Sequence, residues 1–170
     1  MTTFSTSIPA FIDMLGALSG FLDKAGDDKL LEARLAPDML PLASQIRIAC
    51  DQITGAMRRL TGTAIANPDD NDTTLAGAKA RIATMVAWLS GLKESDFPAD
   101  DKRVTLDLPN GMAFEMSAAE HLRDWTLPQF YFHVSIAYAI LRNQNVALGK
   151  TDLMPFMMRY MTKPPTAASV

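Results

Sequence analysis

The sequence predicts an all-α protein, a single four-helix bundle with a short β-hairpin inserted before the last helices. Two observations lead to this fold class. Four separate stretches carry apolar residues at alternating steps of three and four, which is the spacing of helices that pack in a bundle. A fifth stretch alternates apolar and polar residues on both sides of Pro109-Asn110-Gly111, a strong turn signal between two strands. We expect one domain over residues 1–162 and a disordered tail over 163–170.

The first stretch predicts a helix that ends at Gly26. Ser7 is expected to cap its N-terminus, and Pro9 to lie in its first turn, where a missing N–H does no harm. The apolar residues that share one face are Phe4, Ile8, Phe11, Leu15, Leu18 and Leu22.

The second helix is expected to follow Pro37, with Asp38 as its N-cap, Pro41 in its first turn and Gly62 at its end. Its apolar face consists of Met39, Leu42, Ile46, Ala49, Ile53, Ala56 and Leu60. After a polar, turn-rich loop over residues 63–72, a third helix is expected to begin near Asp72 or Thr73 and to close at Gly91. Its apolar face consists of Leu75, Ala78, Ile82, Met85 and Leu89.

The hairpin is expected to pair residues 102–108 with residues 112–116. Because an isolated hairpin is marginal in water, its apolar face should pack on the helices. Ser117 and Glu120 form a capping box that opens a helix reaching about Trp125. Pro128 should then break or kink that helix, and a last long helix should run from about Gln129 to Arg142. Residues 153–161 are expected to add a short helical turn.

Composition narrows the functional classes. The chain has 170 residues and a formal net charge of −3, which argues against nucleic-acid binding through a broad basic face. Its single cysteine, Cys50, lies in an apolar helical stretch and is expected to be a buried structural residue. The N-terminal segment lacks the basic region of a signal peptide, and no uninterrupted apolar run reaches the ~18 residues that span a bilayer. We therefore expect a soluble, cytoplasmic protein without a membrane partner.

One polar cluster stands out because most catalytic signatures are missing. The sequence has no Gly-rich phosphate loop, no Cys pair and no HExxH motif, and its two histidines exclude a site with three His ligands. Gln129 and His133 are four residues apart and share a helix face. Asp38, Gln45 and Gln52 recur at steps of seven beside the core face of the second helix. If these two helices are neighbours, Gln45 or Asp38 can face His133.

Three interpretations of this cluster remain open. The favoured one is a structural polar network, since buried polar groups must be hydrogen-bonded. The second is a small-molecule pocket with His133 as its acid/base or binding group. The third is a metal site, which is least favoured because neutral Gln is a poor ligand for transition metals. The pocket candidates are His133, Gln129, Gln45, Asp38 and Tyr131. His121 is expected at the surface, and the Met-rich segment around Met154–Met161 is expected at an interface or over one end of the bundle.

Three segments of the chain, residues 8–25, 34–51 and 127–153, resemble the bacterial family called domain of unknown function 1993. The residues that carry the likeness are Arg34, Leu35, Asp38, Gln45, Phe130, Tyr131, His133, Leu141 and Arg142. The family is similar in fold to the DinB/YfiT-like superfamily of four-helix bundles, which are often dimeric. The resemblance therefore implies a homodimer.

The better-known members of that superfamily bind a divalent metal through three histidines, and some are metal-dependent thiol transferases. By this resemblance His133 stands at the position of the last metal-binding histidine, and Gln129 stands at the position of the histidine four residues before it. The second helix offers Gln45, Asp51 or Gln52 and no histidine. The metal triad is therefore missing, and we expect no metal and no cofactor. The expected function is a non-metal ligand-binding or dimeric interaction protein. The alternative is a degenerate or altered transferase-like enzyme with a pocket around His133.

Overall fold

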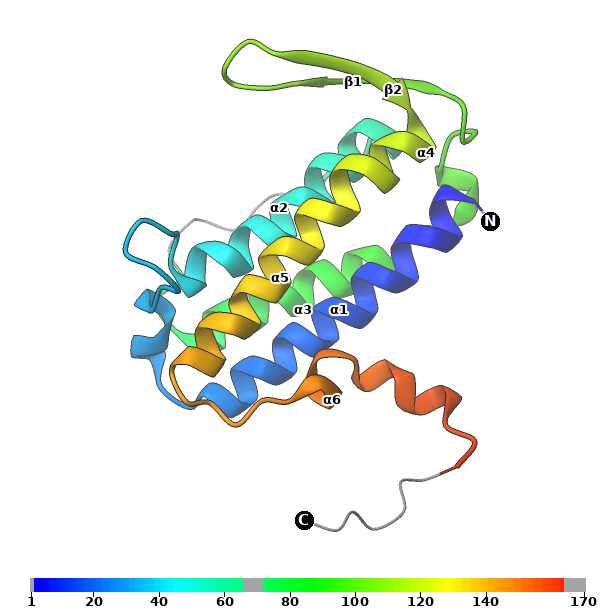
Figure 1. Ribbon diagram of the computed structural model, residues 1–170. Coiled ribbons are helices and arrows are strands. Elements are labelled where there is room, and N and C mark those ends of the chain that lie inside the picture. The colour runs from blue at the N-terminus through cyan, green and yellow to red at the C-terminus, as the bar shows by residue number, and fades with distance from the viewer. Residues whose placement is uncertain (1, 66–71, 164–170) are drawn as a thin grey trace.

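The computed structural model describes residues 2–65 and 72–163, and it has the expected architecture of a four-helix bundle with a hairpin at one end (Figure 1). The long helices are α1 (Thr3–Ala25), α2 (Leu42–Thr61), α3 (Leu75–Gly91) and α5 (Leu127–Asn143). The shorter elements are η1 (Asp28–Glu32), η2 (Glu94–Asp96), β1 (Arg103–Asp107), β2 (Ala113–Ser117), α4 (Ala118–Glu120), η3 (His121–Thr126), α6 (Lys150–Leu153) and η4 (Pro155–Tyr160). The last two confirm a helical turn near the C-terminal end. The expected tail lies outside the described residues beyond Lys163, as do residues 66–71 of the expected loop.

The bundle core is built by the four apolar faces that the sequence predicts. α2 packs mainly against α5, and α1 packs mainly against α3 and α5. At the centre, the rings of Phe11 and Phe130 meet edge to face with centroids 5.0 Å apart, and both side chains are fully buried. Burying a side chain of this size contributes about 1.5–3 kcal/mol. The close packing of α2 on α5 brings the polar edges of these two helices together.

The N-terminal caps of α1 and α2 differ from those expected. Ser7 does not cap α1, because the helix begins earlier, where Thr2 and Ser5 cap each other reciprocally. Ser7 is buried inside the helix and donates to the carbonyl of Thr3. Asp38 does not cap α2, which begins at Leu42 after Pro41. A proline disfavours helical conformation in the residue before it, so the helix cannot extend back to residue 38.

The two expected C-terminal glycines are confirmed. Gly26 ends α1 with φ of 74°, and Gly62 ends α2 with φ of 73°. Both lie in the left-handed region, which glycine adopts without the steric penalty that a Cβ imposes.

The hairpin is present with the expected turn, but only one of its strands is buried. β1 and β2 pair antiparallel, with Leu106 opposite Phe114 and Val104 opposite Met116. Val104 and Leu106 are buried, whereas Phe114 is 41% exposed. The expectation that the whole apolar face packs on the helices is therefore wrong at Met112 and Phe114, which are 49% and 41% exposed, whereas Met116 is partly buried against the core. The hairpin lies across the end of the bundle, and it is β1 that contacts α2 (Figure 1).

Pro128 does not break the last helical region. The chain is helical without interruption from Ala118 to Asn143, and η3, over residues 121–126, is a π-helical stretch just before the proline (Figure 1). The Leu127 N–H bonds to the carbonyl of Leu122, five residues back. A π-helical turn is one way in which a helix accommodates the N–H that proline lacks. This continuity turns His121 inward, so the expected surface histidine is fully buried.

One helix among the described residues, α1, is long and apolar enough to cross a membrane by length and composition alone. Half of the relevant window is buried inside the protein. The core helix of a soluble protein gives the same result, and the apolar face of α1 is used in the bundle core. The fold is that of a soluble helical domain.

Two ion pairs made by α3 give a matched test of the packing. Arg81 bonds to Asp72, and their side chains are only 2% and 15% exposed. Lys79 bonds to Asp23, with side chains 39% and 58% exposed. Replacing Arg81 by Met leaves the partly buried carboxylate of Asp72 without that partner and should cost about 3 kcal/mol of unfolding free energy. Lys79→Met should cost about 0.5 kcal/mol or less, because exposed pairs are screened by water. Urea unfolding of both variants checks the difference, and equal losses would contradict this placement of α3.

Candidate functional site

The structure brings Gln45 of α2 and His133 of α5 into direct contact. The Nδ1 atom of His133 lies 2.8 Å from Oε1 of Gln45. The amide nitrogen of Gln45 donates in turn to the backbone carbonyl of Leu40, at 3.0 Å. Gln45 is 2% exposed and His133 is 9% exposed. The expected hydrogen bond from His133 to a polar group on another helix is therefore confirmed.

This short chain of bonds determines the protonation of the imidazole. A backbone carbonyl only accepts, so the group that Gln45 presents to Leu40 is its amide nitrogen. Gln45 then presents its carbonyl oxygen to His133, and Nδ1 of His133 must be the donor. The neutral ring therefore carries its proton on Nδ1, and Nε2 keeps a lone pair.

Burial keeps this imidazole neutral. Desolvation lowers the pKa of His133 below its ordinary value. The ring of Phe132 stands edge to face against it, with centroids 5.2 Å apart. A neutral ring with a free Nε2 can accept a proton or a hydrogen bond, so its chemistry is that of a weak base at the edge of the α2/α5 seam.

The other pocket candidates are not gathered around this pair. Asp38 lies on the exposed turn before α2, and the carbonyl that Gln45 contacts is that of Leu40. Tyr131 lies on the side of α5 that faces α1, where burial and the charge of Asp13 raise its pKa. Gln129 is half-buried one turn before His133. Of the five candidates, the structure joins Gln45 and His133 by a hydrogen bond.

The residues at this position do not fit a transition metal. Nδ1 of His133 is used by Gln45, so the ring can offer one ligand, Nε2. Gln129 offers only a neutral amide oxygen, which binds such ions poorly. Over residues 2–65 and 72–163, no group of three or more His, Cys, Asp or Glu side chains is placed to hold a metal ion. Apart from this one imidazole nitrogen, the donor set lacks the thiolates, further imidazoles and carboxylates that zinc sites use.

A pocket of about 320 Å³ lies further along the same two helices, under the hairpin. We call it the hairpin pocket. Its walls are the outer face of α2, the end of β1 with its turn, and the last residues of η3. The residues that give it chemical character are Asp51, Gln52, Arg59, Asp107, Trp125 and Thr126. Gln52 was noted in the sequence for its spacing from Gln45, whereas Arg59, Trp125 and Thr126 were not predicted as site residues.

The hairpin pocket contains charges of both signs. Arg59 donates to the carbonyl of Gly55 at 3.0 Å, which holds its guanidinium against α2. Burial lowers the pKa of Arg59, neighbouring Arg58 lowers it further, and the charge of Asp107 opposes both. Asp51 also forms an ion pair with Arg47 at 3.4 Å. The lining therefore offers donors from Arg59 and acceptors from two carboxylates around a Trp125 side chain.

A second buried histidine lies beside this pocket. Nδ1 of His121 is 3.3 Å from the hydroxyl of Thr126, which lines the pocket. Nε2 of His121 has no hydrogen-bond partner in the part of the chain that the structure describes. Burial, with a smaller effect of the nearby Arg59 charge, lowers the pKa of His121 to about 4. The sequence signal nearest to this region is Pro128, because a proline inside a helix marks an irregular turn, and the π-helical turns seen in such places are frequent at functional sites.

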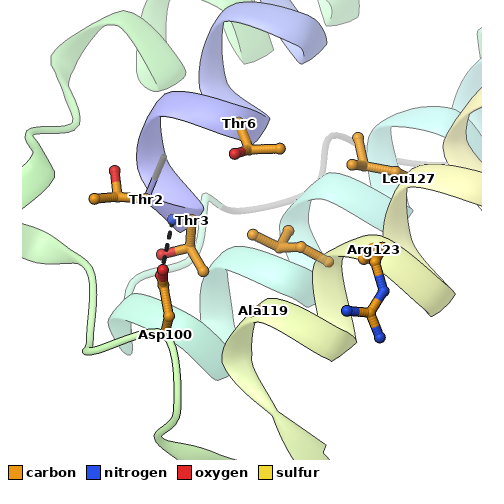
Figure 2. Close-up of a pocket in the computed structure, with 8 residues that line it drawn as sticks. Thr2, Thr3, Thr6, Asp100, Ala119, Arg123 and Leu127 are labelled. Carbon is orange, nitrogen blue, oxygen red and sulfur yellow. Dashed lines mark hydrogen bonds between the residues drawn. The ribbon is translucent and has the colours of Figure 1, made fainter.

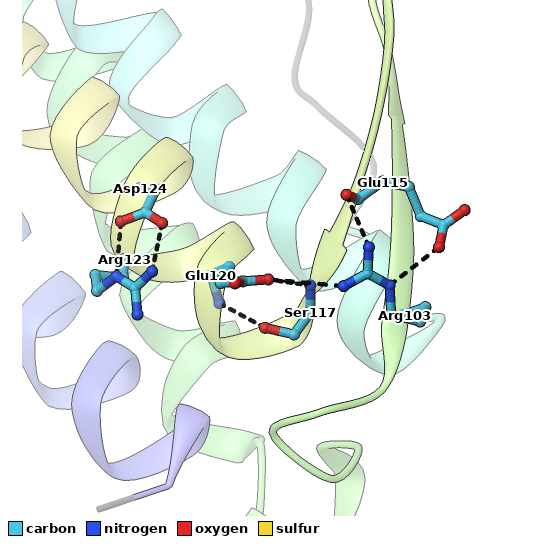
Figure 3. Close-up of polar contacts among 6 residues, drawn as sticks. All are labelled: Arg103, Glu115, Ser117, Glu120, Arg123 and Asp124. Atoms are coloured by element: carbon cyan, nitrogen blue, oxygen red, sulfur yellow. Dashed lines mark hydrogen bonds and ion pairs between the residues drawn. The ribbon is translucent and has the colours of Figure 1, made fainter.

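Polar contacts fix the root of the hairpin beside η3 (Figure 3). Arg103 bonds to both the side chain and the backbone carbonyl of Glu115 on the opposite strand, at 3.0 and 2.9 Å. Ser117 and Glu120 form the expected capping box, and the Ser117 N–H lowers the pKa of the Glu120 carboxyl. Arg103 also lies 3.8 Å from Glu120. These bonds hold β1 and its turn over the hairpin pocket.

Comparison with known proteins gives a sequence family and a similar structure. The family described as domain of unknown function DUF1993 matches residues 3–154. The crystal structure of a DinB family member protein from Shewanella denitrificans is 33% identical, covers 97% of this chain and 95% of that one, and superimposes with a TM-score of 0.80. No curated protein matches.

The bond between Gln45 and His133 should stabilise the fold. Replacing Gln45 by Leu leaves Nδ1 of His133 without its partner, and His133→Ala leaves Gln45 without its own. Each change should lower the free energy of unfolding by about 1–3 kcal/mol. A double-mutant cycle should show a coupling of about 1 kcal/mol in chemical denaturation. The matched control is Gln52→Leu on the same face of α2, which should be nearly neutral. Zero coupling would contradict the bond.

The buried histidines should make stability fall in acid. In the unfolded chain a histidine titrates near ~6.5. Since the folded pKa of His121 is about 4, the unfolded chain takes up the proton first as the pH falls. Stability should be full above pH ~6.5 and decrease by about 1.5 kcal/mol between pH 6.5 and 5 through His121 alone, with His133 adding in the same direction. Urea unfolding of His121→Leu should show a clearly shallower decline, and an unchanged slope would mean that His121 is hydrated.

Proposed function

We propose that this chain, which belongs to the DUF1993 family and shares the helical fold of a DinB family member, is a ligand-binding protein. The ligand is a small molecule that binds in the hairpin pocket without a metal. The observation that carries the proposal is the meeting of the π-helical turn with α2 under the hairpin. That arrangement sets Trp125 and Thr126 across from Gln52 and Arg59 in one cavity. A concave site with a few convergent polar groups is the usual form of a ligand pocket.

The lining favours a particular kind of ligand. Trp125 offers an aromatic wall, which suits a flat group. Asp51 and Asp107 accept hydrogen bonds, so they suit amino groups, while Arg59 donates and suits a carbonyl oxygen. We therefore assign the pocket to a flat heterocycle that carries both amino and carbonyl groups. Its volume of about 320 Å³ sets a limit close to a single small ring system.

The second candidate function is an altered transferase-like enzyme that works at His133. The observation that favours it is the lone pair on Nε2, which the bond to Gln45 leaves available. It ranks second because His133 is only 9% exposed and does not line the hairpin pocket.

We also propose that the protein is a cytoplasmic homodimer. Large apolar side chains are exposed on the C-terminal segment, namely Met157, Met158, Tyr160 and Met161. Such surfaces commonly pair across a two-fold axis. Cys50 is the single cysteine and is buried, so the chain has no internal disulfide, which suits a reducing compartment. Light scattering at micromolar concentration should give twice the chain mass, and Met158→Glu should lower it.

The ligand proposal is tested by fluorescence, because the chain has two tryptophans. Trp88 lies on α3, away from the pocket, so Trp88→Phe leaves Trp125 as the reporter. Flat heterocyclic amines should quench or shift Trp125 emission, and a ligand at a hundred times its Kd should stabilise the protein by about 2.7 kcal/mol. Arg59→Met should weaken binding about tenfold through one lost hydrogen bond to a charged group.

Arg58→Met is the matched control, since Arg58 is the adjacent, exposed arginine and does not line the pocket. It should bind as the unmodified protein does. Equal weakening by Arg58→Met and Arg59→Met would show that only the general charge of α2 matters. If binding is kept in Arg59→Met but lost in His133→Ala, the ligand binds at His133, which would favour the second candidate function.

A further inference from the structure

One aromatic side chain lies at the edge of the hairpin pocket without being part of its wall. The ring of Phe114, on β2, has its centroid 6.4 Å from that of Trp125, and the two ring planes are inclined at 33°. Trp125 lines the pocket, and so does Leu106, the residue that pairs with Phe114 across the hairpin. Phe114 therefore lies one strand further out than the β1 wall of the pocket.

Phe114 is exposed, although the side chains nearer the root of the hairpin on the same face are not. Val104 and Leu106 are 7% and 2% exposed, and Met116 is partly buried against the core, whereas Phe114 is 41% exposed. The contact with Trp125 leaves this part of the Phe114 side chain in water, which is unfavourable for an apolar surface. A ligand that reaches from the pocket to Phe114 would remove that surface from water.

The two rings do not satisfy each other. Aromatic pairs prefer an offset stack or an edge-to-face arrangement, with centroids about 4.5–7 Å apart. An inclination of 33° is neither of these arrangements, and 6.4 Å is near the long end of that range. The pair gains little from its own contact, so either ring can turn its face toward a third ring without losing a strong interaction.

Trp125 is held in place from the other side of η3, which faces a smaller cavity of about 210 Å³ at the first turn of α1 (Figure 2). There the side chain of Asp100 accepts the N–H of Thr3 at 3.0 Å, and its backbone carbonyl accepts the N–H of Ala119 at 3.0 Å. These bonds tie the start of the last helical region to α1, while the bonds of Arg103 hold the root of the hairpin. Both rings therefore stand on elements that are in position before a ligand binds, which lowers the cost of binding.

We propose that the ligand of the hairpin pocket is a fused two-ring heterocycle and that Phe114 selects it over one-ring analogues. The first ring, which carries the amino and carbonyl groups, lies in the pocket against Trp125. The second ring extends toward the hairpin and covers the exposed part of Phe114. Phe114 is thus a specificity-determining residue outside the pocket wall, and this role rests on the ligand site proposed above.

Isocytosine and pterin test the role of Phe114, because pterin is isocytosine with a second ring fused to it and both carry the same amino and carbonyl groups. Calorimetric titration of the full chain should give a Kd for pterin about tenfold below that for isocytosine, since one more ring contacts an aromatic side chain. Phe114→Leu should weaken pterin binding about tenfold and leave isocytosine binding unchanged, so that the difference between the probes disappears. Phe114→Tyr keeps an aromatic ring and should keep the difference.

Phe132→Leu is the matched control, because Phe132 is an exposed phenylalanine of α5 that does not line the pocket, and this change should leave both affinities as they are. A purely structural role of Phe114 would weaken both probes alike in Phe114→Leu and lower the Tm, whereas a selecting role changes the ratio of the two Kd values. Equal Kd values in the unmodified protein, or an unchanged ratio in Phe114→Leu, would overturn the role of Phe114 while the proposed pocket stands. If neither probe binds, the role of Phe114 and the proposed pocket are both wrong.

Discussion

The constraint on which this structure depends is that polar side chains buried between α2 and α5 must be hydrogen-bonded. The chain of bonds from the Leu40 carbonyl through Gln45 to His133 meets that requirement across the seam. Because it joins one position on each helix, it fixes how far α2 and α5 are shifted along each other. With that alignment set, the far end of α2 lies against η3, and the hairpin closes over the place where they meet.

This alignment places two polar regions at different points along α2. One is the hydrogen-bonded pair at His133, and the other is the hairpin pocket at Gln52. At His133 the imidazole is buried, paired and neutral, and the neighbouring groups are amides. Gln52 lies seven residues beyond Gln45 on α2, about 10 Å along the helix, and there the side chains line an open cavity with charges of both signs. The position that resembles a metal site is thus closed by a hydrogen bond, and the space for a ligand lies nearer the hairpin.

Periodicity in the sequence was sufficient for the four helices and the hairpin turn, and it limited the partner of His133 to Gln45 or Asp38 on the condition that α2 and α5 are neighbours. These features follow from local spacing and from the rule that buried polar groups find partners. The cap at Ser7 was wrong because Thr2 and Ser5 cap α1 earlier in the chain, and the cap at Asp38 was wrong because Pro41 prevents α2 from extending back to it. His121 was misplaced because a π-helical turn shifts the inward face, and simple helix spacing does not contain that shift. The pockets come from segments distant in sequence, so spacing along one helix could not predict their walls.

The most direct measurement of the central claim is the protonation state of the His133 ring, read by long-range ¹H–¹⁵N correlation of the imidazole nitrogens. The Leu40–Gln45–His133 chain requires a neutral ring with its proton on Nδ1 and an unprotonated Nε2. That tautomer should be the one seen at neutral pH, and in Gln45→Leu the ring should lose its preference for it. A proton on Nε2, or a doubly protonated ring at neutral pH, would contradict the account.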